Sequence, residues 1–249
     1  ESCSLLVTNV QKINNIIVHQ AILQSGVIRL GDDILLKINN DRRKKIAANH
    51  SSTHLLNQAL RDTLGDHVEQ KGSLVTDKYL RFDFSHNKAL SIDEIRKIET
   101  IISFEINSDR ETLQKMSSYK DAIKSGALAF FDEKYSDDVR VVNVGTKSME
   151  LCGGTHVSRT SFIRLFKVLS ESSVSTGIRR IEAITGDEAY HSYQNLYDDT
   201  KQMSKLLNVK SIDLHQKIIS LKDSEDLNQF KINSLNKKLS LLYLSNLKP

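Results

Sequence analysis

Residues 41–64 read DRRKKIAANHSSTHLLNQALRDTL, and this stretch decides how the chain is organised. Apolar side chains recur at helical spacing after Asp41, which predicts a helix from Asp41 to about Leu64. His50 and His54 are four positions apart within it, so both imidazoles project from the same face, about one turn apart. Alone, this pair is a weak sign of a metal site, because the chain has eight histidines.

A second pair of potential ligands has the same spacing about a hundred residues later, where residues 152–156 read CGGTH. Its two glycines disfavour a helix but allow a tight turn that aims Cys152 and His156 inward. A thiolate with three imidazoles is an acceptable tetrahedral set for zinc. The two pairs together predict one zinc site formed by His50, His54, Cys152 and His156. The alternative is that Cys152 is a small buried hydrophobe and that the histidines are core or surface residues.

The segment before the helix has the composition of short strands. Residues 1–40 carry β-branched and Leu-rich runs, which predict a partial β-barrel. After them, residues 41–186 alternate helices and strands, as expected for an α+β domain with an antiparallel sheet and the zinc site. Ser91 and Glu94 form a capping box that predicts a helix start. The predicted strands are Ser4–Val10, Ile16–Leu23, Ile34–Asn39, Gly72–Asp77, Tyr79–Phe84, Val139–Val144, Phe162–Ser170 and Ile178–Ile184.

Residues 187–249 form a third part, predicted to be a helical tail. Its apolar residues recur at intervals of three and four, and the pattern is broken near Asn208. With nine basic and eight acidic residues, the tail is nearly neutral. It therefore suits a packing or oligomer surface, such as a coiled coil, better than an RNA-binding stripe. A helical hairpin that folds back on its own domain is the equal alternative.

The composition suits a globular intracellular protein. Hydrophobic residues make up 39% of the 249 residues and charged residues 27%. No apolar run approaches the roughly 20 residues that span a bilayer. Two cysteines cannot build a disulfide framework, which indicates a reducing compartment. The net charge of +4 is compatible with an RNA partner. The start at Glu1, without a Met or a signal segment, suggests a piece of a longer polypeptide.

Several motifs together resemble the editing domain of the alanyl-tRNA synthetases. The resemblance covers nearly the whole chain in the correct order. Free-standing alanyl-tRNA editing proteins and the N-terminal editing domain of threonyl-tRNA synthetases share the two ligand pairs, but the long tail after Thr185 argues against both. The glycine-rich segment that precedes the first strands in the family is absent. The motifs are NHSSTHLL at 49–56, QKGS at 70–73, LRFDFSH at 80–86, ELCGGTH at 150–156 and GIRRIEA at 177–183.

The resemblance implies a cytoplasmic, zinc-dependent aminoacyl-tRNA deacylase. Such a domain hydrolyses the ester of seryl- or glycyl-tRNA(Ala), and its partners are the 3′ end of that tRNA and the rest of the synthetase. The aminoacylation domain with its ATP site would lie outside this chain, and a homodimer through the tail is possible. By the same resemblance, Thr53 is the candidate for reading the amino acid, while Gln70 and Ser73 are candidates for orienting water or the terminal ribose. The alternatives are a helix-surface hydroxyl for Thr53, a solvated turn amide for Gln70 and a strand-start cap for Ser73. Whether the zinc is structural or catalytic stays open, because four protein ligands make a closed site.

Two basic clusters are candidates for tRNA binding. Arg42 and Arg43 stand at the start of the first helix, where positive charge opposes the helix dipole, and phosphate contact would offset that cost. Arg179 and Arg180 form the second cluster. A solvated charged face is the default alternative for both.

Two other functions compete with the deacylase. One is a zinc-stabilised tRNA-binding or oligomerisation module without activity of its own. The other is a zinc hydrolase of another class, which ranks last because Ser51 occupies the position of the glutamate in the His-Glu-x-x-His motif.

Overall fold

The computed structural model describes residues 3–14, 16–129 and 137–246. The chain divides into two compact units, residues 1–39 and 40–249. The three-part division at residues 40 and 186 stays a prediction, since the second unit contains both the α+β part and the tail.

The first unit is a β-hairpin. Strands β1 (Ser4–Ile13) and β2 (Ile16–Ser25) pair antiparallel. Nearly every side chain of both strands is exposed. The two predicted strands are confirmed, but the described residues form no closed barrel.

The third strand predicted in this unit, Ile34–Asn39, is wrong. Residues 34–39 have neither strand nor helix structure, and their apolar side chains are exposed. A strand needs a neighbouring backbone to pair with, and within the described part of this unit only the hairpin forms a ladder. β-branched composition alone therefore did not produce a strand here.

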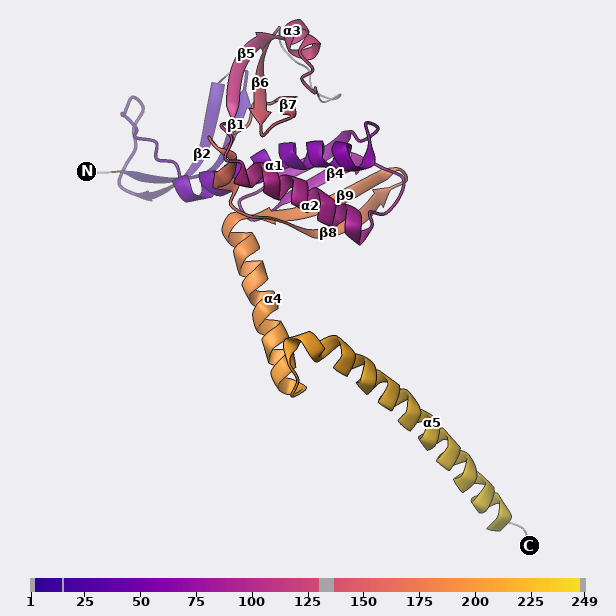
Figure 1. Cartoon of the computed structure of the whole chain (residues 1–249). Coiled ribbons are helices and arrows are strands. Elements are labelled where there is room, and N and C mark those ends of the chain that lie inside the picture. The colour runs from indigo at the N-terminus through magenta and orange to yellow at the C-terminus, as the bar shows by residue number, and fades with distance from the viewer. Residues whose placement is uncertain (1–2, 15, 130–136, 247–249) are drawn as a thin grey trace. The chain divides into compact units, whose positions relative to one another are not determined.

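A sheet covered by two helices forms the main layer of the second unit. The strand order is β3-β4-β9-β8, and all pairs are antiparallel. Helices α1 and α2 lie side by side over one face of this sheet (Figure 1). The elements are α1 (Asn40–Leu64), β3 (Gln70–Val75), β4 (Leu80–Ser85), α2 (Ile92–Asn107), β8 (Phe166–Ser175) and β9 (Ile178–Thr185).

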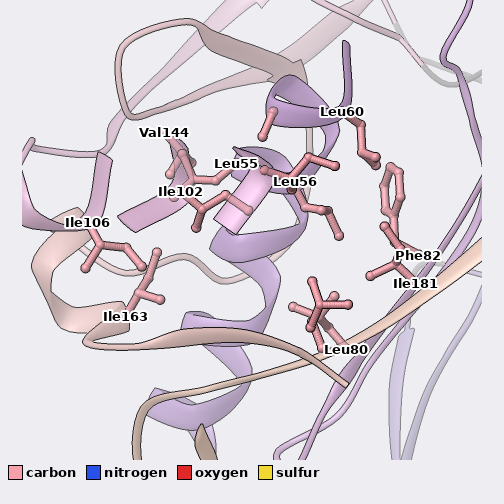
Figure 2. Packing of buried hydrophobic residues seen from close by; sticks show 14 of the residues in the cluster. Leu55, Leu56, Leu60, Leu80, Phe82, Ile102, Ile106, Val144, Ile163 and Ile181 are labelled. Carbon is pink, nitrogen blue, oxygen red and sulfur yellow. The ribbon is translucent and has the colours of Figure 1, made fainter. Parts of the chain in front are cut away.

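The core lies between this sheet and the two helices. Alternate residues of β4, namely Leu80, Phe82 and Phe84, are fully buried against it. Phe82 pairs with Ile181 of β9, and Figure 2 shows these side chains packed with those of α1 and α2. The helix predicted to start at residue 91 is confirmed: Ser91 accepts from the backbone N–H of Glu94, and the Glu94 carboxylate accepts from that of Ser91.

A smaller sheet carries the Cys-His segment. Its order is β5-β6-β7, also antiparallel, and Val139, Val141 and Leu151 contribute to its own small core. The elements are β5 (Leu113–Ser118), α3 (Tyr119–Lys124), β6 (Asp138–Val144) and β7 (Ser148–Leu151).

Three details of the two sheets differ from the sequence-based prediction. β5 was not predicted, because its residues are almost all exposed and lack a clear apolar alternation. β7 was missed because it is only four residues long. The strand predicted over Phe162–Ser170 begins at Phe166, since Thr160–Ile163 form a 3-10 turn, η1.

The tail is helical, as predicted. α4 (Gly186–Leu206) ends before Asn208, which has a positive φ of 52°. A 3-10 turn, η2 (Ser211–Asp213), then leads into α5 (Leu214–Asn246). Almost all described side chains of α5 are exposed. Whether the tail forms a hairpin or a coiled coil stays a prediction. Among the described residues, no helix has the length and apolar character needed to cross a membrane.

Candidate metal centre

The middle of helix α1 supplies two of the predicted ligands. His54 is 2% exposed, and His50 is partly buried one turn earlier. Their ring centroids are 5.4 Å apart. The register of this helix is fixed by Asn49, whose amide donates to the carbonyl of Thr76 and accepts from the hydroxyl of Thr185. The two imidazoles are therefore held by a buried and anchored helix.

The loop after β7 supplies the other two ligands. Cys152 follows the strand directly, and the chain then turns through Gly153 and Gly154 to His156. Gly154 passes so close to α1 that a Cβ on it would lie 1.9 Å from Cε1 of His50. The sequence explained the two glycines by a tight turn. The structure adds a second reason for Gly154, since a side chain there would collide with the His50 ring.

The four predicted ligands do come together. Cys152 Sγ lies 3.4 Å from His50 Nε2 and 3.3 Å from His156 Nε2. The four candidate ligand atoms all lie within 4.8 Å of one another. Zinc bonds of about 2.0–2.3 Å place tetrahedral ligand atoms about 3.3–3.8 Å apart. The donor set suits a zinc ion, the two distances from Cys152 Sγ match this spacing, and the group could hold a metal.

Each imidazole of the group also has a partner on its other side. His156 Nδ1 lies 3.1 Å from Ser51 Oγ, which accepts from the backbone N–H of Val157. His54 Nδ1 lies 3.1 Å from a carboxylate oxygen of Glu150, although its N–H is not aligned as a hydrogen bond. His50 contacts the backbone of Thr155. For His156 and His54 these contacts occupy Nδ1 and leave Nε2 for a metal, and for His50 it is Nε2 that lies beside Cys152 Sγ.

Burial favours the neutral form of all three imidazoles. It lowers the pKa of His156 to about 3, with added repulsion from His50 and Arg140. It also lowers the pKa of His50, and that of His54 falls well below its ordinary value. Neutral imidazole is the form that binds metal ions, so burial keeps the three histidines in the form that a metal needs.

Two residues that sequence reasoning did not single out are part of the centre. Arg140 on β6 donates to the carbonyl of Gly154 at 2.6 Å and so fixes the Cys-His loop. The Glu150 carboxyl is buried, which raises its pKa to about 8. Glu150 stands inside the quoted ELCGGTH segment, so its position gave a signal. Arg140 gave none, because nothing in the sequence tells which strand runs beside the loop.

The predicted catalytic residues lie on α1 and β3. Thr53 is buried, and its hydroxyl donates to the backbone carbonyl of His50 at 2.7 Å. Gln70 and Ser73 are together on β3, with the Gln70 amide 3.4 Å from Ser73 Oγ. Ser73 pairs with Phe82 and so shares the sheet face that α1 covers. Their roles toward a substrate stay predictions.

The predicted RNA-binding arginines differ in their surroundings. Arg42 is largely exposed and lies 3.7 Å from Asp77, and Arg43 is exposed on the same helix end. Arg179 and Arg180 on β9 are instead engaged with carboxylates inside the sheet. The Arg179 guanidinium donates to both oxygens of Glu171, and that of Arg180 to both oxygens of Asp83. These pairs give the second cluster a structural role beside the predicted one.

The close approach of Gly154 yields a test of the centre. Gly154→Ala should displace the His50 ring and lower zinc affinity by at least about 10-fold, since even the partners of metal ligands change affinity by about 10–100-fold. Gly153→Ala is the matched control, because a Cβ there meets nothing within 4 Å. Zinc competition with a chromophoric chelator measures both, and equal affinities would contradict the described position of His50.

Comparison with known proteins places these residues in a family context. Residues 139–182 match the model of the threonyl and alanyl tRNA synthetase second additional domain, a range that includes Cys152 and His156. The chain is 44% identical over 94% of its length to the alanine–tRNA ligase of Cupriavidus necator, of which it covers 27%. It is 44% identical over 90% of its length to that of Ralstonia nicotianae, of which it covers 24%.

A third relative gives the same result: the chain is 42% identical over 92% of its length to the alanine–tRNA ligase of Paraburkholderia xenovorans, of which it covers 25%. The chain thus spans about a quarter of the length of these relatives. It is similar along nearly its whole length to a segment of the alanine–tRNA ligases, and its residues 139–182 match the second additional domain of the threonyl and alanyl tRNA synthetases.

Proposed function

We propose that this chain is the editing part of an alanyl-tRNA synthetase and hydrolyses the ester of seryl- or glycyl-tRNA(Ala). The observation that carries the proposal is the four-residue ligand group, assembled from α1 and the loop after β7, in a chain with this relationship to the alanine–tRNA ligases. The second additional domain match supports the editing role for the part that holds Cys152 and His156.

The physical need for such a site follows from the size of alanine. A pocket made for its methyl group cannot strongly reject glycine, which is smaller, or serine, which adds only a hydroxyl. Such differences are worth about 1–3 kcal/mol in binding. A second site that hydrolyses the wrong ester corrects the error after transfer to tRNA.

Zinc is the proposed cofactor, held by His50, His54, Cys152 and His156. When bound, it would supply a fixed positive charge beside the ester. With four protein ligands the centre resembles a closed structural site. In that case the ligands hold α1 and the loop after β7 together and shape the pocket, and other side chains position the water and the ester.

Thr53, Gln70 and Ser73 are the proposed residues for substrate. The Thr53 hydroxyl uses its proton for the His50 carbonyl, so toward a substrate it can only accept a hydrogen bond, for example from a serine hydroxyl or an amino group. Gln70 and Ser73 sit at hydrogen-bonding distance from each other on β3, and either could turn its polar group to a water or to the terminal ribose.

The proposed partners are the 3′ end of tRNA(Ala) and the remaining parts of the synthetase, in the cytoplasm. Arg42, Arg43, Arg179 and Arg180 are the proposed contacts to tRNA. Of these, Arg42 and Arg43 are the more accessible. To contact tRNA, Arg179 would have to leave Glu171 and Arg180 would have to leave Asp83. Each arginine would then lose its charge-assisted hydrogen bonds to the carboxylate.

A second candidate function is a zinc-stabilised tRNA-binding or oligomerisation module without activity of its own. The exposed apolar residues of α5 favour this candidate. Four of them recur at intervals of three, four and three and are about half exposed or more, a surface that a homodimer would cover. They are Ile232, Leu235, Leu239 and Leu242, exposed by 49%, 62%, 53% and 62%.

Removal of the thiolate ligand tests the leading proposal. Cys152→Ala should lower zinc affinity by more than about 100-fold, because a direct ligand contributes more than its outer partners. It should also abolish deacylation of seryl-tRNA(Ala). Cys3→Ala is the matched control, since Cys3 is the chain's other cysteine, is exposed and lies outside the ligand group.

The substrates separate the two candidate functions. The wild-type chain should hydrolyse seryl-tRNA(Ala) and spare alanyl-tRNA(Ala) when the two are incubated in parallel. Zinc and tRNA binding without turnover of either ester would instead support the non-enzymatic module. Full activity of metal-free protein would contradict any role of zinc in the reaction.

The proposed binding of tRNA at the start of α1 is tested by salt dependence. The double variant Arg42→Gln/Arg43→Gln should bind tRNA less tightly and lower the slope of log K against log salt by about 0.7–0.9 for each phosphate that the protein no longer neutralises. Lys237→Gln/Lys238→Gln removes equal charge from α5 and should leave the slope unchanged. An unchanged slope for the arginine variant would remove this cluster from the interface.

A further inference from the structure

The buried carboxyl of Glu150 belongs to the most enclosed ion contact among the described residues of the second unit. Its side chain is 3% exposed and that of His54 is 2% exposed. Glu150 lies on β7, two residues before Cys152, and this strand contacts α1. A carboxyl group loses its hydration when it is buried in this way, so it needs partners that compensate for the loss.

Helix α1 provides both partners. The Asn57 amide donates to Glu150 Oε1 at 2.9 Å, and Oε2 lies 3.1 Å from His54 Nδ1. His54 and Asn57 are three positions apart, so they project from the same face of the helix. Asn57 is itself 3% exposed. The Asn57 amide therefore gives the two oxygens of Glu150 different partners: Oε1 accepts from Asn57, and Oε2 faces the His54 imidazole.

This arrangement determines which nitrogen of His54 can bind a metal. In its ionised form the Glu150 carboxyl can only accept a hydrogen bond, so it holds the hydrogen of His54 on Nδ1 and leaves the lone pair on Nε2. The N–H is close to the oxygen but not aligned with it.

We propose that Glu150, oriented by Asn57, is a positioning residue that sets the tautomer of His54 and thereby the metal affinity of the centre. This inference rests on the proposed zinc site and goes beyond it, because neither residue is a ligand. The other two histidines have a hydroxyl and a backbone contact on their outer side. Glu150 is the carboxyl group of the set, and in its ionised form it makes a charge-assisted contact, which is stronger than a neutral one.

The amide variant makes the inference testable. In Glu150→Gln, the side-chain oxygen must still accept from Asn57, so the new NH2 group faces His54. That group donates to Nδ1 and moves the ring proton to Nε2, the nitrogen that a metal needs free. Zinc affinity should fall by about 10–100-fold, the usual effect of an outer partner.

Two further variants separate tautomer control from general damage. In the double variant Asn57→Asp/Glu150→Gln, the new carboxylate at position 57 accepts a hydrogen bond from the amide NH2 group at position 150. The amide oxygen at position 150 then faces His54 Nδ1, as the carboxylate oxygen does in the wild type. Part of the lost zinc affinity should therefore return. Glu99→Gln is the matched control, a largely buried carboxylate that accepts from the Val168 backbone and from Lys167, away from the metal group. It should keep wild-type zinc affinity.

The measurement is zinc affinity of the full 249-residue chain by chelator competition, together with urea unfolding in excess chelator. Wild-type affinity in Glu150→Gln would overturn the inference, even if the metal-free protein is less stable, because Glu150 would then serve the fold alone. A double variant no better than the single one would also contradict it. If the wild-type chain itself binds no zinc, the proposed zinc site fails instead. Should Glu150→Gln not fold, Asn57→Ala decides in its place: unchanged affinity there overturns the inference.

Discussion

A metal centre built from two distant segments requires that both be held rigidly against each other, and helix α1 is the element that meets this requirement. The same helix packs Leu55, Leu56 and Leu60 into the core between the sheet and α2. Asn49 fixes its register through hydrogen bonds to the β3–β4 turn and to the end of β9. The face of α1 that holds His50 and His54 is therefore set by the packing of the opposite face, and any rotation of the helix would disturb the core.

The loop after β7 is held as firmly. Arg140 binds the carbonyl of Gly154, Ser51 on α1 links the loop backbone at Val157 to His156, and Glu150 joins β7 to α1. Three neutral imidazoles and a buried carboxyl in one place are costly for a fold without compensation. A metal would compensate the three imidazoles directly, because it replaces water as the partner of each ligand atom.

The sequence predicted the parts that depend on local pattern. The helix over 41–64, the Ser91 capping box and the helical tail with its break near Asn208 each follow from spacing or capping residues a few positions apart. The convergence of the four candidate ligands was also predicted, since two pairs at one spacing and a zinc-compatible chemistry carry that information. What failed was the strand at 34–39, where composition was right but no ladder partner exists within the described part of its unit.

Other features could not be read from the sequence, because they depend on which segments become neighbours. Arg140 contacts the ligand loop only because β6 pairs with β7. The tight space at Gly154 exists only because His50 lies opposite it. The pairing of Arg179 with Glu171 and of Arg180 with Asp83 depends on the order β4-β9-β8 in the sheet. Residues that sequence alone suggested for tRNA thus have a second, structural interpretation.

X-ray absorption spectroscopy at the zinc edge, on purified and zinc-loaded protein, tests the proposed metal centre most directly. A centre with these four ligands requires one zinc per chain, with one sulfur at about 2.3 Å and three nitrogens at about 2.0–2.1 Å. Cys152 would supply the sulfur and His50, His54 and His156 the nitrogens. A spectrum without a sulfur neighbour, or a protein that takes up no zinc, would contradict it.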